Sequence, residues 1–301
     1  MASAKENNFN NLPKIIYIMG TARSGSTILE ILLENGKYAF GAGEVIHIPR
    51  DAFLKNNKCS CCNNCHDCNI WGQIYKKFCL SENELTNWIN IQKQIDSHFG
   101  EIKLLSGLIS KQNIAKYKKL NLQLIKYIYQ ETGCSFLIDS SKYAGRAFAM
   151  DKIAPGHVFT ICLTRSPAGL LHTFQKPNKS EQKPKKPISV LMYYIVSLSA
   201  LKLASLTLKN RPLYMTYEEL IKSPINSMEK IEKWYGLDLI NTKIKIMQKG
   251  FFTAKHIVTG NRLRKQKKIQ FKSSLGEYKL KGAEKRIVLS IMIFWKKILN
   301  F

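Results

Sequence analysis

Short apolar runs alternate along this chain with longer segments that have helical spacing. Residues 14–19, 135–138, 157–164 and 211–216 form the apolar runs, and β-branched residues are frequent in the first of them. Uninterrupted apolar runs of this length are typical of strands buried in a parallel sheet. Because helical segments separate them, the pattern predicts an α/β fold with a central parallel sheet flanked by helices.

Helical spacing covers residues 28–33, 81–99, 102–132, 143–150 and 217–235. Ser81 and Glu84 have the spacing of a capping box, and Gly236 is placed to end the last of these helices after a break at Pro224. Residues 187–208 are the most apolar stretch, but Lys202 and four serines interrupt it, which favours a buried helix over a membrane span. The run 287–295 has basic flanks and predicts an amphipathic closing helix.

The first strand and the first helix are joined by a loop framed by Gly20 and Gly25, with Ser26 and Thr27 at its exit. A strand, a glycine-rich loop and a helix in this order bind phosphate groups, because backbone N–H groups and the helix N-terminus point at the anion. The loop nearly fits the G-x4-G-K-[ST] pattern of nucleotide triphosphatases, but Ser26 replaces its Lys and the cation is Arg23. Since that Lys reaches the β/γ-phosphates, we expect a ligand with an anionic 5′ group that requires no metal.

Polar residues follow several predicted strands and are further candidates for a ligand-binding site. Glu44 follows a glycine turn, the segment 139–142 ends the second apolar run, and Arg165 ends the third. Carboxyl ends of parallel strands meet at one edge of a sheet, where ligands bind. Residues 262–272 form a basic run without an acid, which would bind phosphate if it lies near this edge.

The chain of 301 residues has a formal net charge of +26, which favours an anionic partner. Lys accounts for 39 of the 47 basic residues, so a compositional bias that adds solvated surface Lys explains the total equally well. Residues 1–13 are polar and predicted to be disordered, residues 176–187 form a basic, Pro-rich loop, and residues 14–301 are expected to form one domain. No signal peptide is visible, so we expect a cytoplasmic protein, with peripheral membrane contact left open and nucleic acid not expected as a partner.

Five of the eight cysteines fall within residues 58–71, an insert that closes with Trp71. Cys65-x-x-Cys68 has the spacing of metal ligands, but no second such pair follows at zinc-finger distance. Three interpretations stay open: a structural zinc site to which His66 can contribute, a local disulfide, or reduced thiols that pack a loop. The candidate zinc ligands are Cys59, Cys61, Cys65 and Cys68.

Segments in this order resemble the bacterial sulfotransferase family, which uses 3′-phosphoadenosine 5′-phosphosulfate as donor. Residues 20–27 resemble its 5′-phosphosulfate loop, and Arg165-Ser166-Pro167 with Thr173 resembles its 3′-phosphate motif. Gly43-Glu44 is similar to a Gly-Glu pair of the tyrosylprotein branch, and residues 139–142, residues 260–264 and the Cys-rich insert match further recurrent segments. The K-[ST]-H segment of phenol and steroid sulfotransferases is absent, which shifts the expected base to Glu44.

The resemblance implies a single α/β domain with a phosphosulfate-binding loop. It also implies transfer of a sulfuryl group, without a metal, to a hydroxyl of a sugar, lipid, tyrosine or small alcohol. Acidic or saccharide acceptors are among the candidates. Glu44 would accept the acceptor proton, and Arg23 would stabilise the charge that develops on the bridging oxygen of the leaving 5′-phosphate. Lys142 would reach the sulfuryl oxygens or that bridging oxygen. The implied donor-binding residues are Gly20, Thr21, Arg23, Ser24, Gly25, Ser26, Thr27, Arg165, Thr173, Gly260, Asn261 and Arg264.

Two other functions compete with this interpretation. A phosphate-loop kinase or nucleotide hydrolase needs the loop Lys, which is missing, and a magnesium-binding Asp, for which Asp139 is the one candidate after an apolar run. A non-enzymatic nucleic-acid or membrane binder needs clustered basic residues with interleaved aromatics, whereas the basic clusters here are short and the aromatics are scattered.

Overall fold

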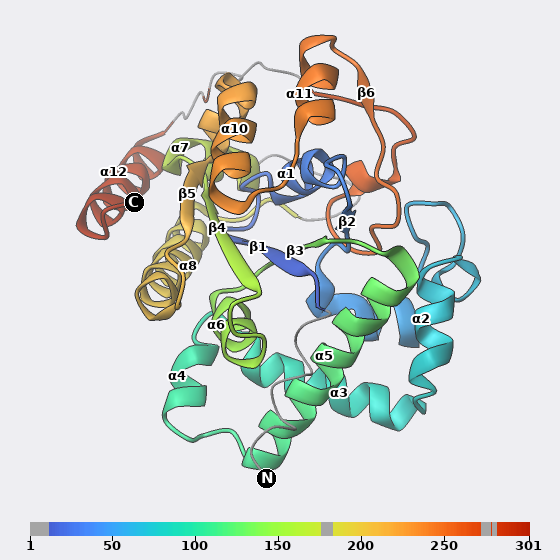
Figure 1. The fold of residues 1–301 in the computed structure, drawn as a ribbon. Coiled ribbons are helices and arrows are strands. Elements are labelled where there is room, and N and C mark those ends of the chain that lie inside the picture. The colour runs from blue at the N-terminus through green and yellow to red at the C-terminus, as the bar shows by residue number, and fades with distance from the viewer. Residues whose placement is uncertain (1–11, 176–182, 272–277, 279–281) are drawn as a thin grey trace.

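The computed structural model describes residues 12–175, 183–271, 278 and 282–301, and five parallel strands form its central sheet in the order β2-β3-β1-β4-β5 (Figure 1). Helices cover both faces of the sheet, so the predicted α/β fold class is confirmed. The strands are β1 (Lys14–Gly20), β2 (Ala39–Gly41), β3 (Phe136–Lys142), β4 (Val158–Thr164) and β5 (Leu213–Thr216).

The central strand β1 separates two apolar layers. Ile15, Tyr17 and Met19 pack on one side of the sheet, and Ile16 and Ile18 pack on the other. The alternation follows from the two-residue period of a strand, and all five side chains are buried because helices cover both faces.

The first layer contains α2 (Trp71–Phe78), α3 (Glu82–Ile95), α5 (Lys111–Thr132), α6 (Ala144–Ile153), α7 (Pro167–Gln175), α8 (Pro187–Thr207) and α12 (Ala283–Ile298). The second contains α1 (Ser26–Leu33), α9 (Tyr217–Lys222), α10 (Pro224–Tyr235) and part of α11 (Ile240–Met247). The remaining elements are α4 (Gly100–Leu105), the ribbon of β6 (Phe251–Phe252) with β7 (Ile269–Gln270), the 3₁₀ turns η1 (Val45–His47), η3 (Cys65–Asp67) and η4 (Arg262–Lys265), and the π-helix η2 (Pro49–Leu54).

The predicted helix ends at Ser81 and Gly236 are confirmed, whereas one predicted helix is divided into two. The Ser81–Glu84 capping box and the left-handed Gly236 cap are both present. The predicted helix over 102–132 is instead two helices, because Gly107 has φ of +74° and Ser110 caps the start of α5.

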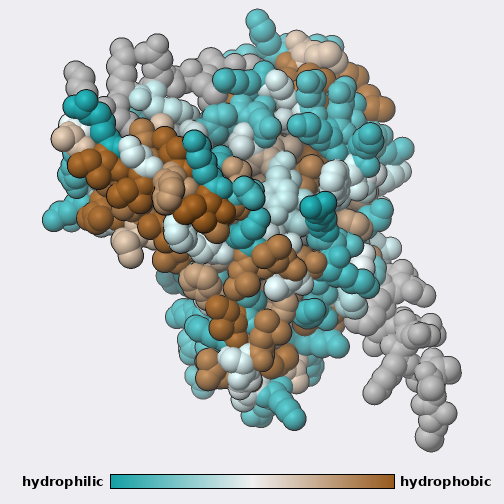
Figure 2. Space-filling model, turned by 90° about the vertical axis from the view of Figure 1, so that its left-hand side faces the viewer, coloured by the Kyte–Doolittle hydropathy of each residue, from teal (hydrophilic) through white to brown (hydrophobic). Residues whose placement is uncertain are grey.

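Helix α8 packs against α6, α7, α12 and β1. It is long and apolar enough to cross a membrane by length and composition, but half of its apolar window is buried inside the fold. The closing helix α12 is longer than the predicted run 287–295, and its Val288 and Met292 side chains are buried. Ile287, Ile291 and Phe294 point outward from it, and Figure 2 shows a broad apolar surface on the side of the molecule where α12 and α8 lie.

Two predictions lie mostly outside the described residues. They are the disordered N-terminus, of which residues 12 and 13 are described, and the first part of the basic loop 176–187. At the end of that loop, the Lys185 N–H donates to the carbonyl oxygen of Phe174 at 3.0 Å, just before α8 begins.

Candidate active site

The loop between β1 and α1 requires glycine at both ends of its motif. A Cβ at Gly20 would collide with the carbonyl oxygen of Leu163 on the neighbouring strand. Gly25 has φ of +89°, and a Cβ there would also collide with the ring of Tyr217. Both positions are therefore set by tertiary contacts as well as by backbone conformation.

The rest of this loop is largely buried, and its one cation, Arg23, is partly exposed and lines the cavity. The Ala22 N–H donates to the hydroxyl oxygen of Tyr193 at 2.6 Å, and Arg23 has φ of +65°, a conformation uncommon for a residue with a side chain. Ser26 and Thr27 form the first turn of α1, whose unpaired N–H groups favour an anion.

A cavity of about 560 Å³ lies in front of this loop, within the size range of small-molecule sites. Eleven of the residues predicted from the sequence line it together. They are Gly20, Arg23, Gly25, Ser26, Thr27, Glu44, Lys142, Arg165, Thr173, Gly260 and Asn261.

Arg165 directly follows β4 and lines the cavity next to the glycine loop. One of its Nη atoms donates to the carbonyl oxygen of Arg23 at 2.9 Å and the other to the hydroxyl of Tyr278 at 3.1 Å. The guanidinium carbon is 4.2 Å from the centre of the Tyr217 ring, which makes a cation–π contact. The Arg165 Nε atom is buried and has no hydrogen-bond partner among the described residues. One of the three nitrogen atoms of this guanidinium therefore has no protein partner among the described residues.

Glu44 and Lys142 form an ion pair on another side of the cavity. Lys142 ends β3 with φ of +74°, and this unusual backbone conformation accompanies the placement of its side chain in the cavity. Their side chains are 16% and 18% exposed, so the pair is only partly shielded from water. His47 Nε2 is 3.6 Å from the other carboxylate oxygen of Glu44, and burial lowers the pKa of His47.

Two contacts fix the backbone around Glu44. Its N–H donates to Thr259 Oγ1, whose hydroxyl donates in turn to the carbonyl oxygen of Glu44, both at 3.0 Å. The preceding Gly43 N–H donates to the Glu30 carboxyl at 2.5 Å, and the Ser140 hydroxyl binds the same group at 2.7 Å. Glu30 is fully buried, and this burial raises its pKa to about 8. The Glu44 main chain is thus tied to α1, β3 and the segment after β6.

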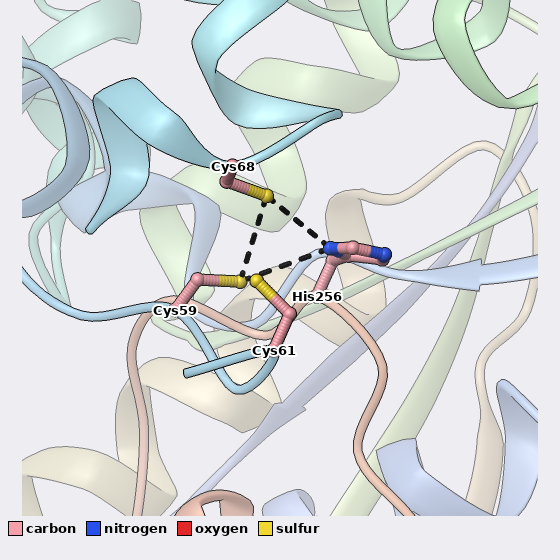
Figure 3. Close-up of side chains that lie close together, drawn as sticks. All are labelled: Cys59, Cys61, Cys68 and His256. Carbon is pink, nitrogen blue, oxygen red and sulfur yellow. Dashed lines mark hydrogen bonds between the residues drawn. The ribbon is translucent and has the colours of Figure 1, made fainter. Parts of the chain in front are cut away.

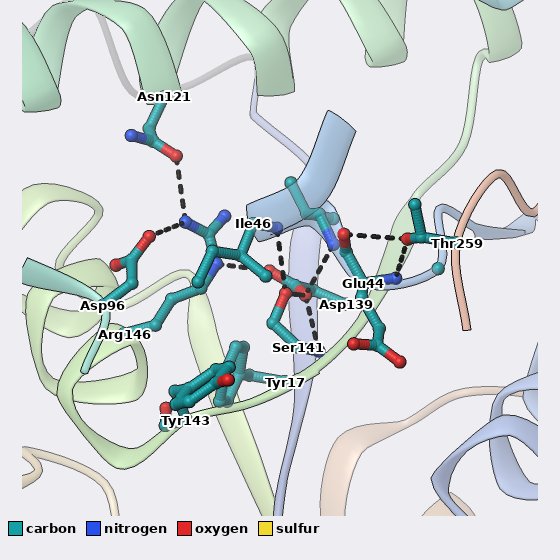
Figure 4. A network of polar contacts seen from close by, with 12 residues as sticks. Tyr17, Glu44, Ile46, Asp96, Asn121, Asp139, Ser141, Tyr143, Arg146 and Thr259 are labelled. Atoms are coloured by element: carbon teal, nitrogen blue, oxygen red, sulfur yellow. Dashed lines mark hydrogen bonds and ion pairs between the residues drawn. The ribbon is translucent and has the colours of Figure 1, made fainter. Parts of the chain in front are cut away.

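A buried charge network lies behind this pair (Figure 4). Arg146 Nε donates to Asp139 at 2.9 Å, and Arg146 Nη1 donates to Asp96 and Asn121, both at 3.1 Å. Burial raises the pKa of Asp96 to about 6, against the opposing effect of Arg146. Asp139 also accepts from the N–H groups of Val45 and Ser141, so its carboxylate is fully used by the fold. That leaves it no position for a magnesium ion.

Three predicted donor-binding residues lie outside the cavity lining. Thr21 and Ser24 are buried beneath the loop, and their hydroxyl oxygens have no partner among the described residues. The prediction that Arg264 binds the donor is not supported by its position in the structure. Its side chain is almost completely buried, and Nη1 donates to the carbonyl oxygens of Lys58 and Ile257, both at 3.1 Å. Arg264 therefore joins the Cys-rich insert to the segment after β6.

The structure also changes the set of residues predicted at the Cys-rich insert. Cys59, Cys61 and Cys68 meet His256, while Cys65 is not part of this group. His66 points elsewhere: its Nε2 is 2.8 Å from the carbonyl oxygen of Phe53, and its ring stacks on Tyr75. Cys65 packs into the core instead. His256 is almost 190 residues beyond the insert, so no local spacing could have identified it.

Sequence reasoning did not identify several side chains of the cavity. His98, Tyr143 and Tyr193 line one part of it, and Tyr217 and Leu263 line others. Burial lowers the pKa of His98, and its Nδ1 atom has no hydrogen-bond partner among the described residues. Tyr217 directly follows β5, so its position at a strand end was a usable signal. His98 and Tyr193 belong to segments that read as ordinary buried helix.

Neither a protein-family model nor a curated protein sequence matches this chain. Among the solved structures that resemble its fold are three sulfotransferases. The sulfotransferase domain from the curacin biosynthetic pathway is 14% identical, with a TM-score of 0.53, and the alignment covers 96% of this chain and 98% of that one.

The other two are less similar in structure. Sulfotransferase STF9 from Mycobacterium avium is 11% identical, with a TM-score of 0.49 and coverage of 95% and 77%. The sulfotransferase domain from the Synechococcus PCC 7002 olefin synthase is 16% identical, with a TM-score of 0.41 and coverage of 94% and 95%. On the first of these likenesses, the chain has the fold of a sulfotransferase domain.

Proposed function

We propose that this chain transfers a sulfuryl group from 3′-phosphoadenosine 5′-phosphosulfate to a hydroxyl group of an acceptor. The observation that carries this proposal is the arrangement of three cations around one cavity. Arg23 belongs to the glycine loop, Arg165 follows β4 and donates to the carbonyl oxygen of Arg23, and Lys142 is paired with Glu44. A donor with phosphates at both ends of its ribose needs two separate anion sites, and a cavity of this kind supplies them.

The loop 20–27 would hold the 5′-phosphosulfate, and Arg165 with Thr173 would hold the 3′-phosphate. The unpartnered Nε of Arg165 fits this role, because a buried donor without a partner is costly until a ligand satisfies it. Ser24 Oγ, within the glycine loop, is a second buried polar atom that has no partner among the described residues. Since the loop has no Lys and Asp139 is held by Arg146, the proposal requires no magnesium.

In the reaction, the acceptor oxygen forms a bond to sulfur while the bond from sulfur to the bridging oxygen of the 5′-phosphate breaks. The acceptor proton moves to a carboxylate oxygen of Glu44, and adenosine 3′,5′-bisphosphate leaves with the bonding electrons. Arg23 and the loop N–H groups stabilise the negative charge on the leaving oxygen.

The ion pair suggests how the base is kept ready. Without donor, Lys142 neutralises Glu44. The oxygens of a bound sulfuryl group are a second set of anionic partners for the Lys142 ammonium. If Lys142 moves from Glu44 to these oxygens, Glu44 is free to accept a proton. The pair is partly exposed, so this exchange does not require a buried charge to lose its only partner. The Gly43-Glu44 pair in the sequence supports a base of the kind used by the tyrosylprotein branch.

Calorimetric titration with adenosine 3′,5′-bisphosphate in the presence of EDTA tests the proposal. We expect tight binding that EDTA leaves unchanged, and weaker binding of ADP, which lacks the 3′-phosphate. Equal affinity for ADP, or binding that requires magnesium, would contradict the donor assignment. Incubation with labelled donor and a crude cell extract, followed by identification of the labelled product, then defines the acceptor.

A further inference from the structure

We propose that Cys59, Cys61, Cys68 and His256 bind one structural zinc ion that fastens the Cys-rich insert to the segment covering the donor cavity. Their ligand atoms all lie within 4.8 Å of one another, and Figure 3 shows the three sulfur atoms and the imidazole converging on one point. Two of the thiols come from one turn of the insert, the third lies just before α2, and the imidazole comes from the segment after β6.

The distances match the edges of a tetrahedral site. Cys59 Sγ and Cys68 Sγ are 4.0 Å apart, and His256 Nδ1 is 3.3 Å from Cys68 Sγ and 3.9 Å from Cys59 Sγ. With Zn–S bonds of about 2.3 Å and Zn–N bonds of about 2.1 Å, a regular tetrahedron has edges of about 3.6–3.8 Å. A small adjustment of side-chain torsions would therefore bring all four atoms to zinc-bonding distance.

The chemistry of the ligands favours zinc over the other two interpretations of the insert. Three thiolates and one imidazole form a Cys₃His set, which is typical of structural zinc sites and has no open position. The 4.0 Å between Cys59 Sγ and Cys68 Sγ is about twice a disulfide bond length. Binding would release the thiol protons to solvent, so that three thiolates and Zn²⁺ leave one net negative charge.

The surroundings hold the ligand-bearing backbone in place. Trp71 Nε1 donates to the carbonyl oxygen of His256 at 2.6 Å, and the Ser60 hydroxyl donates to that of Ile257 at 2.7 Å. Arg264 donates to the carbonyl oxygens of Lys58 and Ile257, which are the neighbours of Cys59 and His256. Contacts of this kind around a metal site orient its ligands, and here they join the same two segments that the zinc would join.

The position of His256 links this site to the cavity. Thr259, three residues later, binds the main chain of Glu44, and Gly260 and Asn261 line the cavity itself. The segment between β6 and η4 has no regular secondary structure. A metal at His256 would therefore restrict the part of this segment that covers the glycine loop.

Metal analysis of the purified full-length chain, kept reduced, tests the site directly. We expect about one equivalent of zinc in the wild type and in Cys65→Ser, which changes a buried thiol of the same insert outside the proposed set. Cys68→Ser and His256→Gln should retain little zinc. If Cys65→Ser loses zinc as completely as Cys68→Ser, the ligand set is wrong.

Titration of the metal-depleted wild type with Co²⁺ keeps the test independent of variant folding. Four ligands with three thiolates should give intense visible absorption typical of tetrahedral Co²⁺, together with thiolate charge-transfer bands, saturating at one equivalent. Addition of Zn²⁺ should abolish these bands. A wild type that holds no zinc and gives no such spectrum would overturn the proposal. None of these measurements depends on sulfuryl transfer, so their failure is distinguishable from failure of the proposed function.

Discussion

Two groups of charged side chains each include one residue of β3: the network of Arg146, Asp96 and Asp139, and the pair of Glu44 and Lys142. The two groups differ in burial and in the chemistry that they can carry out. The side chains of Arg146, Asp96 and Asp139 are at most 2% exposed and hydrogen-bonded on several sides. The Glu44–Lys142 pair is 16% and 18% exposed and lines the cavity. Carboxylates paired with cations thus form a permanent network in one place and an accessible pair in the other.

Solvation explains the difference. Water cannot solvate a fully buried charge that has lost its partner, so removing one member of the network strongly destabilises the fold. A pair at the edge of a cavity exchanges its partner for water or for a ligand at small cost. The buried network therefore positions β3, and the accessible pair is suited to proton transfer.

Replacement of Arg146 tests the buried side of this comparison and should have the largest effect. Arg146→Met leaves Asp96 and Asp139 without their cation, and we expect unfolding to become easier by about 3–5 kcal/mol, or the chain not to fold. The matched variant Lys142→Met removes the cation of the accessible pair and should cost about 1 kcal/mol or less. Urea unfolding of the two variants measures both. Similar losses of stability would mean that burial does not separate the two groups.

Replacement of Glu44 tests the accessible side. Glu44→Gln keeps the shape of the side chain but cannot accept a proton, so transfer should slow by about 10²–10⁴-fold while affinity for adenosine 3′,5′-bisphosphate is retained. Turnover with labelled donor and calorimetry measure the two quantities. Turnover near that of the wild type would remove Glu44 from the mechanism and direct attention to His98, whose imidazole lines the same cavity.

Arg165 is a third cation to compare with these two groups, because one donor atom of its guanidinium has no partner among the described residues. Arg165→Ala should weaken binding of adenosine 3′,5′-bisphosphate by about 10–150-fold, as loss of a charge-assisted hydrogen bond of about 1.5–3 kcal/mol predicts. ADP serves as the matched ligand, and its affinity should change little. An equal loss for both nucleotides would place Arg165 at a phosphate that they share.

Glu30 gives a pH dependence of the free energy of unfolding. Its pKa is raised from 4.5 to about 8 in the folded chain, so between these values the native state binds more protons than the unfolded state. The free energy of unfolding should therefore fall as pH rises through this range, by up to about 1.4 kcal/mol per pH unit from this group. Glu30→Gln mimics the protonated form, donating to Ser140 and accepting from Gly43, and should remove that part of the slope.

Urea unfolding of wild type and Glu30→Gln at several pH values between 5 and 8 measures this slope. Glu34, whose pKa burial also raises to about 8, keeps its own contribution in both proteins. Parallel curves for the two proteins would mean that Glu30 is ionised within the fold.

By itself, the sequence determined the features that depend on neighbours along the chain. The apolar runs predicted four of the five strands of the sheet, and the capping box at Ser81 and the glycine at Gly236 predicted helix ends. Glu44, Lys142 and Arg165 could be expected near the glycine loop, because carboxyl ends of parallel strands meet at one edge. Local conformation and the geometry of a parallel sheet were sufficient for these predictions.

Only the tertiary structure decided which distant side chains meet. It placed Arg264 against two carbonyl groups instead of in the cavity, and it brought His256 to the cysteines in place of Cys65. It also placed His98 and Tyr193 in the cavity lining. Such contacts join residues far apart in sequence, so helical or strand spacing carries no information about them, and burial of the whole chain determines which polar groups become partners.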